Sequence, residues 1–202
     1  MSSRRTISRG SGLLSRKKSF ADLERHAWAR DSIEALASKG IVGGVGGQAF
    51  EPGRGVTRAE FAVMLVEALG LAGDTPSSFT DVKPGDYFYR AAGALRQNGI
   101  SNGAGDGRFL PNAVISRQEM MTMAARALRS QGMLEAPEAG SPPEFEDFGQ
   151  ISAYAREGIA RLAAAGLIQG NEGRIRPVEH ATRAEAAVFL YRIYLYAGEA
   201  AE

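Results

Sequence analysis

Three arginines in this chain of 202 residues occupy the same place in a short pattern, hydroxyl-Arg-x-Glu, which begins at Thr57, Ser116 and Thr182. In such a quartet the hydroxyl accepts a hydrogen bond from the backbone N–H three residues later, and the glutamate accepts one from the N–H of the hydroxyl residue. Each quartet therefore predicts the first turn of a helix. Because a helix N-terminus carries unpaired N–H groups and partial positive charge, an arginine placed there predicts a binding site for a carboxylate.

The first-turn arginines, Arg58, Arg117 and Arg183, have two further interpretations. Each could be a solvated charge, or it could form a salt bridge within the protein. Recurrence in three places fits these roles as well as ligand binding, so the sequence leaves the choice open. The hydroxyl and the glutamate of each quartet are interpreted as helix caps, worth about 0.5–2 kcal/mol per helix.

Each quartet closes a longer unit that is written three times. A copy opens with Phe-x-Asp, continues with an aromatic residue, a leucine and two glycines, and then has an apolar residue shortly before a proline. The aspartate could hydrogen-bond sugar hydroxyls, and the aromatic ring could stack on a sugar face. The alternatives are a cap or a closed turn for the aspartates, core packing for the aromatics and backbone geometry for the glycines.

The apolar spacing within a copy predicts two helices. The first runs from the aromatic residue to the first glycine, and the second begins at the quartet, with Gly70, Gly132 and Gly198 as candidate stops. The loop between them is too irregular to predict a strand. Because such short helices cannot bury their apolar faces alone, the copies are expected to pack around a shared core. The sequence thus predicts an all-α fold of three helix-loop-helix repeats in three lobes.

We expect the repeats to span residues 20–70, 79–130 and 145–198, which together form one composite domain over 20–198. Residues 1–19 hold six basic residues and no acid, and are interpreted as a tail or linker, with a polyanion contact as the alternative. The rest of the chain has 18 basic and 23 acidic residues, so nucleic acid is not an expected partner. We expect no membrane span, and no secretory signal is visible.

Residue types that serve catalysis and metal binding are scarce. The chain has no cysteine and only two histidines, His26 and His180, which excludes thiolate sites and a multi-histidine metal centre. Neither histidine is paired with a recognisable nucleophile. The recurring acids are explained by caps and turns. We therefore expect no enzyme activity, no metal site and no cofactor.

The ordered motifs resemble those of the S-layer homology (SLH) family: Phe-x-Asp, an aromatic, "GIVGG", an apolar residue near a proline and "TRAE". The resemblance implies an all-helical assembly with pseudo-threefold symmetry. It also implies grooves between neighbouring repeats that bind anionic secondary cell-wall polysaccharide, often with pyruvylated sugars. The groove residues that it implies are Asp22, Trp28, Gly43, Gly44 and Arg58 in the first copy, Asp81, Tyr87, Asn102, Gly103 and Arg117 in the second, and Asp147, Tyr154, Gln169, Gly170 and Arg183 in the third.

The resemblance thus implies non-covalent anchoring at a bacterial cell surface, with secondary cell-wall polysaccharide as the partner. Because the copies differ in their loops and aromatic residues, the three grooves are not expected to be equivalent. The alternative is a module for protein interaction or assembly that reuses the fold without binding glycan, with other surface-layer proteins as partners. A fragment of a wall-active enzyme is a third possibility.

Overall fold

The computed structural model describes residues 18–73, 78–135 and 145–200. In this part of the chain the α-helices are α1 (Arg30–Ser38), α2 (Arg58–Leu69), α3 (Tyr89–Gln97), α4 (Arg117–Ser130), α5 (Ala153–Ala164) and α6 (Arg183–Glu199), and the two short 3-10 helices are η1 (Glu24–Ala29) and η2 (Phe148–Gln150). The described residues form isolated bridges but no strand. The all-α prediction is confirmed. Residues 1–17 of the predicted tail lie outside these ranges. Most of the segment between the second and third copies lies outside them as well.

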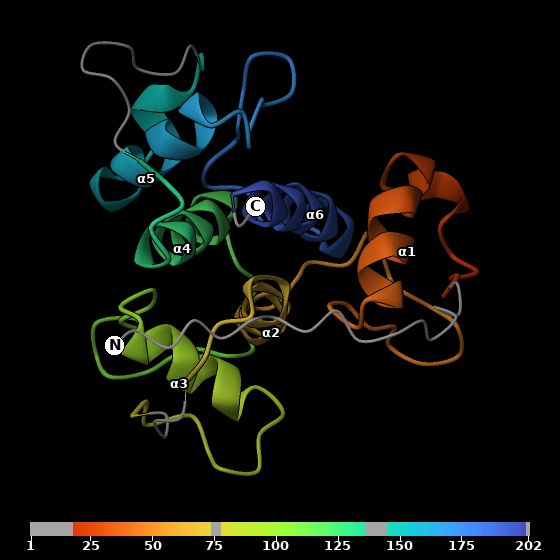
Figure 1. Ribbon diagram of the computed structural model, residues 1–202, viewed down its shortest axis with the longest axis horizontal. Coiled ribbons are helices and arrows are strands. Elements are labelled where there is room, and N and C mark those ends of the chain that lie inside the picture. The colour runs from red at the N-terminus through yellow and green to blue at the C-terminus, as the bar shows by residue number, and fades with distance from the viewer. Residues whose placement is uncertain (1–17, 74–77, 136–144, 201–202) are drawn as a thin grey trace, which may run out of the picture.

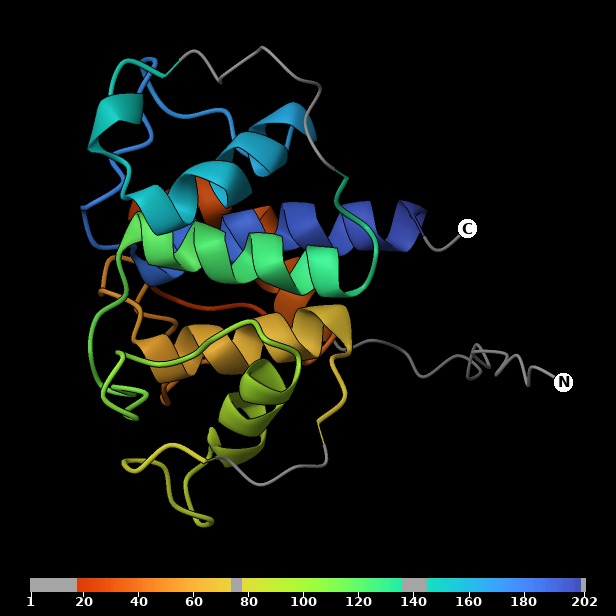
Figure 2. The same cartoon turned by 90° about the vertical axis from the view of Figure 1, so that its left-hand side faces the viewer.

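The second helix of each copy lies at the centre of the molecule. Figure 1 shows α2, α4 and α6 together in the middle and α1, α3 and α5 around them, and Figure 2 shows that the three central helices run in the same direction. Their buried apolar side chains include Leu65, Leu128 and Leu190, each with 0% exposure. The shared core and the three lobes predicted from the sequence are confirmed.

Each lobe combines helices from two different copies. The peripheral α3 packs on α2 and α5 packs on α4, so the first helix of one copy covers the second helix of the preceding copy. The series closes on itself because α1, from the first copy, packs on α6, from the third. Ile33 and Leu36 of α1 are fully buried. The arrangement is therefore a closed ring of three units rather than an open stack.

A triangle of backbone hydrogen bonds joins the three copies just before the central helices. Val56 N–H donates to Ala181 O at 3.0 Å, Ala181 N–H donates to Ile115 O at 3.1 Å, and Ile115 N–H donates to Val56 O at 3.0 Å. All three residues are at most 1% exposed. Buried amide groups must be paired, so these bonds fix the three segments to one another.

The helix boundaries follow the capping chemistry with two exceptions. All three quartets form complete capping boxes, at Thr57, Ser116 and Thr182, and Gly70 ends α2 with φ 58°. The predicted stop at Gly198 is wrong, because α6 continues to Glu199. Only in the third copy does the aromatic residue lie in the first turn of the first α-helix, where Tyr154 follows Ala153. Trp28 instead lies in η1, and Tyr87 precedes α3.

The closed ring predicts that two copies do not fold as the whole chain does. A chain ending at residue 135 loses α6, on which α1 packs, and two of the three hydrogen bonds of the backbone triangle. We expect it to lose the cooperative thermal transition that the full chain shows by circular dichroism. A chain that begins at Lys18 keeps every contact described above and is the control. A cooperative two-copy fragment would contradict the closed ring.

Candidate functional site

The quartet arginines form a second ring, made of side chains. Arg58 Nη1 lies 3.0 Å from Glu119 Oε1, Arg117 Nη1 lies 2.7 Å from Glu185 Oε1, and Arg183 Nη1 lies 3.0 Å from Glu60 Oε1. Each arginine thus pairs with the quartet glutamate of the next copy. Of the interpretations that the sequence left open, the salt bridge within the protein is present at all three positions.

The N-termini of the central helices are already supplied with acceptors. The first N–H of each helix donates to a carbonyl of a neighbouring copy: Arg58 to Ala113, Arg117 to Glu179 and Arg183 to Arg54, all at 2.8–2.9 Å. The second N–H does the same, and the third bonds the capping hydroxyl. The expectation of unpaired N–H groups that attract an anion is therefore wrong. An anion at this end of the helices would have to be bound by side chains instead.

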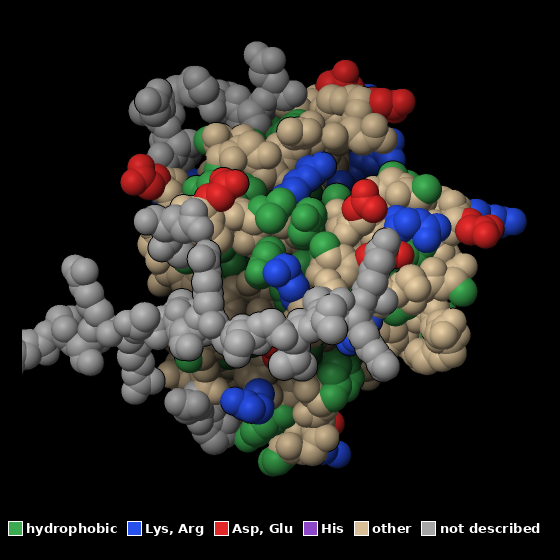
Figure 3. Space-filling model, turned by 45° about the vertical axis from the view of Figure 1, so that its right-hand side comes forward, with side chains coloured by type: hydrophobic (Ala, Val, Ile, Leu, Met, Phe, Trp, Pro, Cys, Tyr) green, Lys and Arg blue, Asp and Glu red, His purple; other side chains and the backbone are tan. Residues whose placement is uncertain are grey.

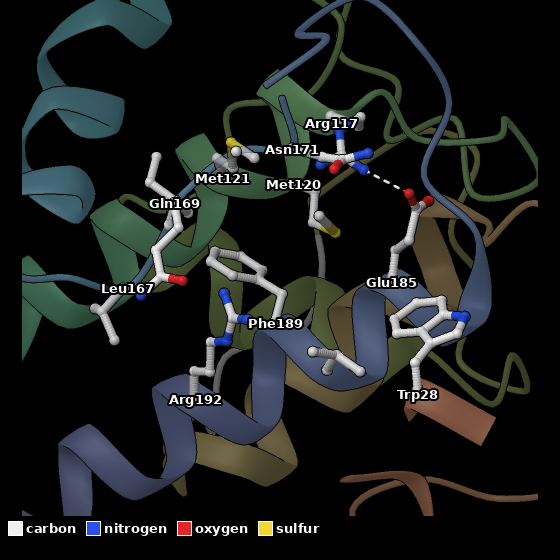
Figure 4. A pocket seen from close by; sticks show the side chains of 13 residues that line it. Trp28, Arg117, Met120, Met121, Leu167, Gln169, Asn171, Glu185, Phe189 and Arg192 are labelled. Atoms are coloured by element: carbon white, nitrogen blue, oxygen red, sulfur yellow. Dashed lines mark hydrogen bonds and ion pairs between the residues drawn. The ribbon is translucent and has the colours of Figure 1, made fainter. Parts of the chain in front are cut away.

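One groove contains Trp28 and is called the Trp28 groove. Its volume is about 410 Å³, and its lining includes Trp28, Arg117, Gln169, Glu185 and Arg192. Figure 4 shows the Arg117–Glu185 pair at one end, Trp28 beside it, and Gln169 on the opposite side, with Arg192 rising from α6. Trp28 is 59% exposed although it lies on the groove wall. The groove thus offers a flat apolar ring near two guanidinium groups.

A second groove, called the Tyr154 groove, has the same construction. Its volume is about 330 Å³, and its lining includes Arg58, Asn102, Glu119, Arg126 and Tyr154. Each residue aligns with one in the Trp28 groove, as Arg58 does with Arg117. The pseudo-symmetry therefore repeats the chemistry, and not only the backbone.

Arg58 is less completely occupied than the other two quartet arginines. Its Nε is buried and has no hydrogen-bond partner among the described residues, whereas Arg117 Nε donates to Ile175 O at 2.7 Å. Arg58 Nη2 reaches only the Ser101 hydroxyl, at 3.3 Å. Within the described chain Arg58 therefore donates through its Nη atoms alone, whereas Arg117 also uses its Nε.

The third equivalent position, around Tyr87, differs in charge and in occupancy. Arg183 is 3% exposed, and its guanidinium donates to Phe50 O, Glu60 and Gly43 O at 2.8–3.0 Å. Burial and the nearby Glu60 carboxylate raise the pKa of Tyr87, and Thr57 hydrogen-bonds its side chain, so its hydroxyl faces the protein's own groups. At the position of Arg126 and Arg192 the first copy has Glu67. Among the described residues, neither the quartet arginine nor the counterpart of Arg126 offers a free guanidinium group at this corner.

Each groove takes one element from each copy. Trp28 comes from the first copy, Arg117 from the second and Gln169 with Gly170 from the third. The Tyr154 groove likewise joins Tyr154, Arg58, and Asn102 with Gly103. The sets named copy by copy in the sequence therefore contain the right kinds of residue but do not lie together in space. All three aromatics are exposed, at 59%, 69% and 53% for Trp28, Tyr87 and Tyr154, so core packing does not apply.

The glycines of the loops have a backbone role. A Cβ on Gly44 would lie 2.7 Å from Ala49 O and 2.8 Å from the Phe20 ring, and a Cβ on Gly103 or Gly170 would lie 2.3–3.2 Å from the equivalent groups. Gly43 presents its carbonyl to Arg183. These loops therefore press against the opening phenylalanine of each copy. In the Trp28 and Tyr154 grooves they also form part of the wall.

The Phe-x-Asp aspartates hold the loop that precedes each quartet. Asp22 accepts hydrogen bonds from the N–H groups of Phe50 and Glu51, Asp81 from those of Phe109 and Leu110, and Asp147 from those of Ile175 and Arg176, at 2.7–3.1 Å. The second residue of each pair has a positive φ, from 51° to 60°, which costs energy in non-glycine residues. The aspartates therefore close a strained turn, and none of them lines the Trp28 or Tyr154 groove.

The sequence missed Arg126 and Arg192, the basic residues that line these grooves beside the quartet arginines. Both lie two helical turns after the quartet glutamate, on the same face of the helix, so helical spacing from that glutamate would have found them. Arg192 is exposed, and Arg126 donates to Ile100 O at 3.2 Å.

Two negative findings concern the described ranges. No cluster of three or more His, Cys, Asp or Glu side chains there could hold a metal ion. None of the helices described is both long and apolar enough to cross a membrane.

Removal of an Asp81 carboxylate is expected to destabilise the fold. Asp81→Ala leaves the N–H groups of Phe109 and Leu110 unpaired, and Phe109 is fully buried. We expect a loss of about 3 kcal/mol in the free energy of unfolding, measured with urea. Lys83→Ala, an exposed change on the same loop, is the control. An unchanged free energy for Asp81→Ala would contradict the turn-closing role.

Acid is expected to weaken the ring of arginine–glutamate pairs. Burial opposes ionisation of Glu60 and Glu119, but hydrogen bonds from their caps and from Arg54 or Arg58 outweigh it, so both pKa values lie below the ordinary 4.5. Groups with a lowered pKa stabilise the fold above their ordinary value and lose that contribution as the pH falls. The melting temperature should therefore fall as the pH is lowered below about 4.5, and it should fall less steeply in the Glu119→Gln variant. Equal slopes would contradict this.

The comparisons with known proteins agree with this architecture. Residues 19–62, 78–121 and 144–187 match the S-layer homology domain. The chain is 38% identical over 176 residues to an amylopullulanase of Thermoanaerobacterium thermosulfurigenes, which covers 86% of the chain and 9% of that protein. It is 37% identical over 183 residues to the exoglucanase XynX of Acetivibrio thermocellus, and this alignment covers 90% of the chain and 17% of that protein. It is 32% identical over 176 residues to the S-layer protein sap of Bacillus anthracis, and this alignment covers 86% of the chain and 21% of that protein.

The alignment thus spans at most about a fifth of these relatives, and their similarity to this chain does not extend to the remainder of either enzyme. It covers the repeat region here, which is an anchoring module and not a catalytic one. With three matched segments that together cover more than half of its residues, the chain belongs to the S-layer homology domain family.

Proposed function

We propose that this chain anchors a protein to the bacterial cell wall by binding an anionic secondary cell-wall polysaccharide in the Trp28 and Tyr154 grooves. The observation that carries the proposal is the repeated combination of an exposed aromatic ring, two arginines and a glycine-containing loop in both grooves. Sugars bind proteins through stacking on aromatic faces and through hydrogen bonds, and a carboxylate on the sugar suits a guanidinium.

The lining of the Trp28 groove is apolar on one side and in its floor and basic at its edge, which suits an acidic sugar. Trp28 presents its ring on one side, Met120 and Phe189 supply an apolar floor, and Arg192 is exposed at the edge. On the face drawn in Figure 3, Lys and Arg side chains lie beside hydrophobic side chains near the middle of the molecule. A sugar carrying a pyruvate ketal would combine an apolar ring face with a carboxylate, and would match both.

Two grooves rather than three are proposed to bind. Arg183 is buried and its donors are used within the protein, and Glu67 replaces the second arginine near Tyr87. Two weak grooves on one polymer would raise the overall affinity through effective concentration. We therefore assign ligand contact to Trp28, Arg117, Arg192, Arg58, Arg126 and Tyr154, with the glycine loops as walls. The aspartates and Arg183 are left with structural roles.

The alternative, an assembly module that binds other proteins, predicts indifference to the wall polymer. Purified sacculi before and after chemical removal of the secondary polymer separate the two functions. We expect co-sedimentation of the chain with intact sacculi and its loss after removal. Retention on stripped sacculi would favour the assembly module and contradict the proposal.

Two substitutions test the Trp28 groove without disturbing the arginine ring. Trp28→Ala and Arg192→Gln each change an exposed side chain, so the melting temperature should hold while the affinity for intact sacculi falls about tenfold, the equivalent of 1.4 kcal/mol. Arg90→Gln, an exposed arginine on α3 outside both grooves, is the matched control. Equal affinity of all four proteins would contradict the assignment. Alanine at Arg117 is less informative, because it also breaks the pair with Glu185.

A further inference from the structure

A second hollow adjoins the Tyr154 groove on the lobe formed by α4 and α5. Its volume is about 180 Å³, and it shares Thr122, Arg126 and Tyr154 with the groove. The two hollows are thus neighbours with common walls. Its other lining residues include Arg129, Glu157 and Arg161, and we call it the arginine pocket.

The charges in the arginine pocket do not balance. Arg126, Arg129 and Arg161 face one acid, Glu157. Arg161 Nη2 lies 2.6 Å from Glu157 Oε1, whereas Arg129 Nη1 lies 3.9 Å from the same oxygen, at the limit of an ion pair. The Arg129 side chain is 59% exposed. One carboxylate cannot neutralise three guanidinium groups, so the pocket keeps an excess of positive charge that favours an anion.

The close packing of α4 on α5 brings these arginines together. A Cβ on Gly158 would lie 3.0 Å from Ala125 Cβ, so the absence of a side chain at Gly158 allows the approach of the two helices. Arg126 and Arg129 project from α4 and Arg161 from α5. The cluster is therefore a product of tertiary packing.

The arginine pocket is not a feature of the repeat. Arg129 aligns with Gly70 in the first copy and Leu195 in the third, and Arg161 aligns with Ala35 and Ala94. The other two lobes cannot form it. A ligand contact here would accordingly be particular to this chain and this lobe.

We propose that the arginine pocket binds a second acidic group of the glycan chain whose first acidic group lies at Arg58 and Arg126, with the polymer crossing Tyr154. This inference rests on the proposed function and deepens it, because it assigns two adjacent acidic residues of one polymer to one lobe. A glycan fits better than a nucleic acid. Residues 20–202 carry more acidic than basic groups, and nucleic acid binding calls for an extended basic surface.

The test compares two synthetic probes by calorimetry, a disaccharide with one pyruvate ketal and a tetrasaccharide with two. All proteins carry Trp28→Ala, which isolates the Tyr154 groove. We expect this parent protein to bind the two-acid probe about tenfold more tightly than the one-acid probe. Arg129→Gln with Arg161→Gln should abolish that preference and leave the one-acid affinity unchanged. Arg90→Gln is the control, and Arg129→Gln alone serves if the double variant melts early.

The outcomes separate the two proposals. The wild-type chain is titrated with both probes as a reference, and if it binds neither, the proposed function fails and this inference fails with it. If the parent prefers the two-acid probe and the double variant keeps that preference, the arginine pocket is not the second subsite, although the proposed function stands. An equal affinity of the parent for both probes would also exclude the pocket as the second subsite. A short oligothymidylate that binds the parent as tightly as the two-acid probe would overturn the choice of a glycan.

Discussion

The interaction on which the structure depends is the cyclic pairing of the three quartets at one end of the central helices. Parallel helices bring their positive N-terminal ends together, which is unfavourable unless negative groups or acceptors are supplied. Here each helix receives carbonyl groups from a neighbouring copy, a capping glutamate of its own, and the arginine of the preceding copy, which that glutamate binds. The same three contacts recur around the ring, so no copy can complete its helix start without the other two.

This arrangement uses the three quartet arginines to different extents within the protein. Arg183 is used entirely within the protein, Arg117 partly, and Arg58 least, since its Nε has no partner in the described chain. The same motif thus occurs three times, and its arginine is hydrogen-bonded within the protein to a different extent in each copy. Positions outside the motif, such as Arg126, Arg192 and Glu67, then set the charge of each groove separately.

Much of the fold could be predicted because its signals are local. The capping boxes at Thr57, Ser116 and Thr182 state where the central helices begin, and the three copies imply a shared core. The exchange of first helices between copies could not be predicted, because any pairing of α1, α3 and α5 with the central helices buries similar apolar faces. The Trp28 groove illustrates the limit: its aromatic, arginine and loop come from three copies, and only the packing brings them together. The sequence left two roles open for Asp81, because a carboxylate can accept hydrogen bonds from a turn or from a ligand equally well.

The contact between α1 and α6 has a kinetic consequence. The first of these helices ends at Ser38 and the second begins at Arg183, so the lobe that they form depends on a closure over almost the whole repeat region. Such long-range contacts slow folding, because the entropy of loop closure is lost before the contact is gained. During synthesis the buried face of α1 stays uncovered until α6 has emerged, so the lobe that these two helices form closes late.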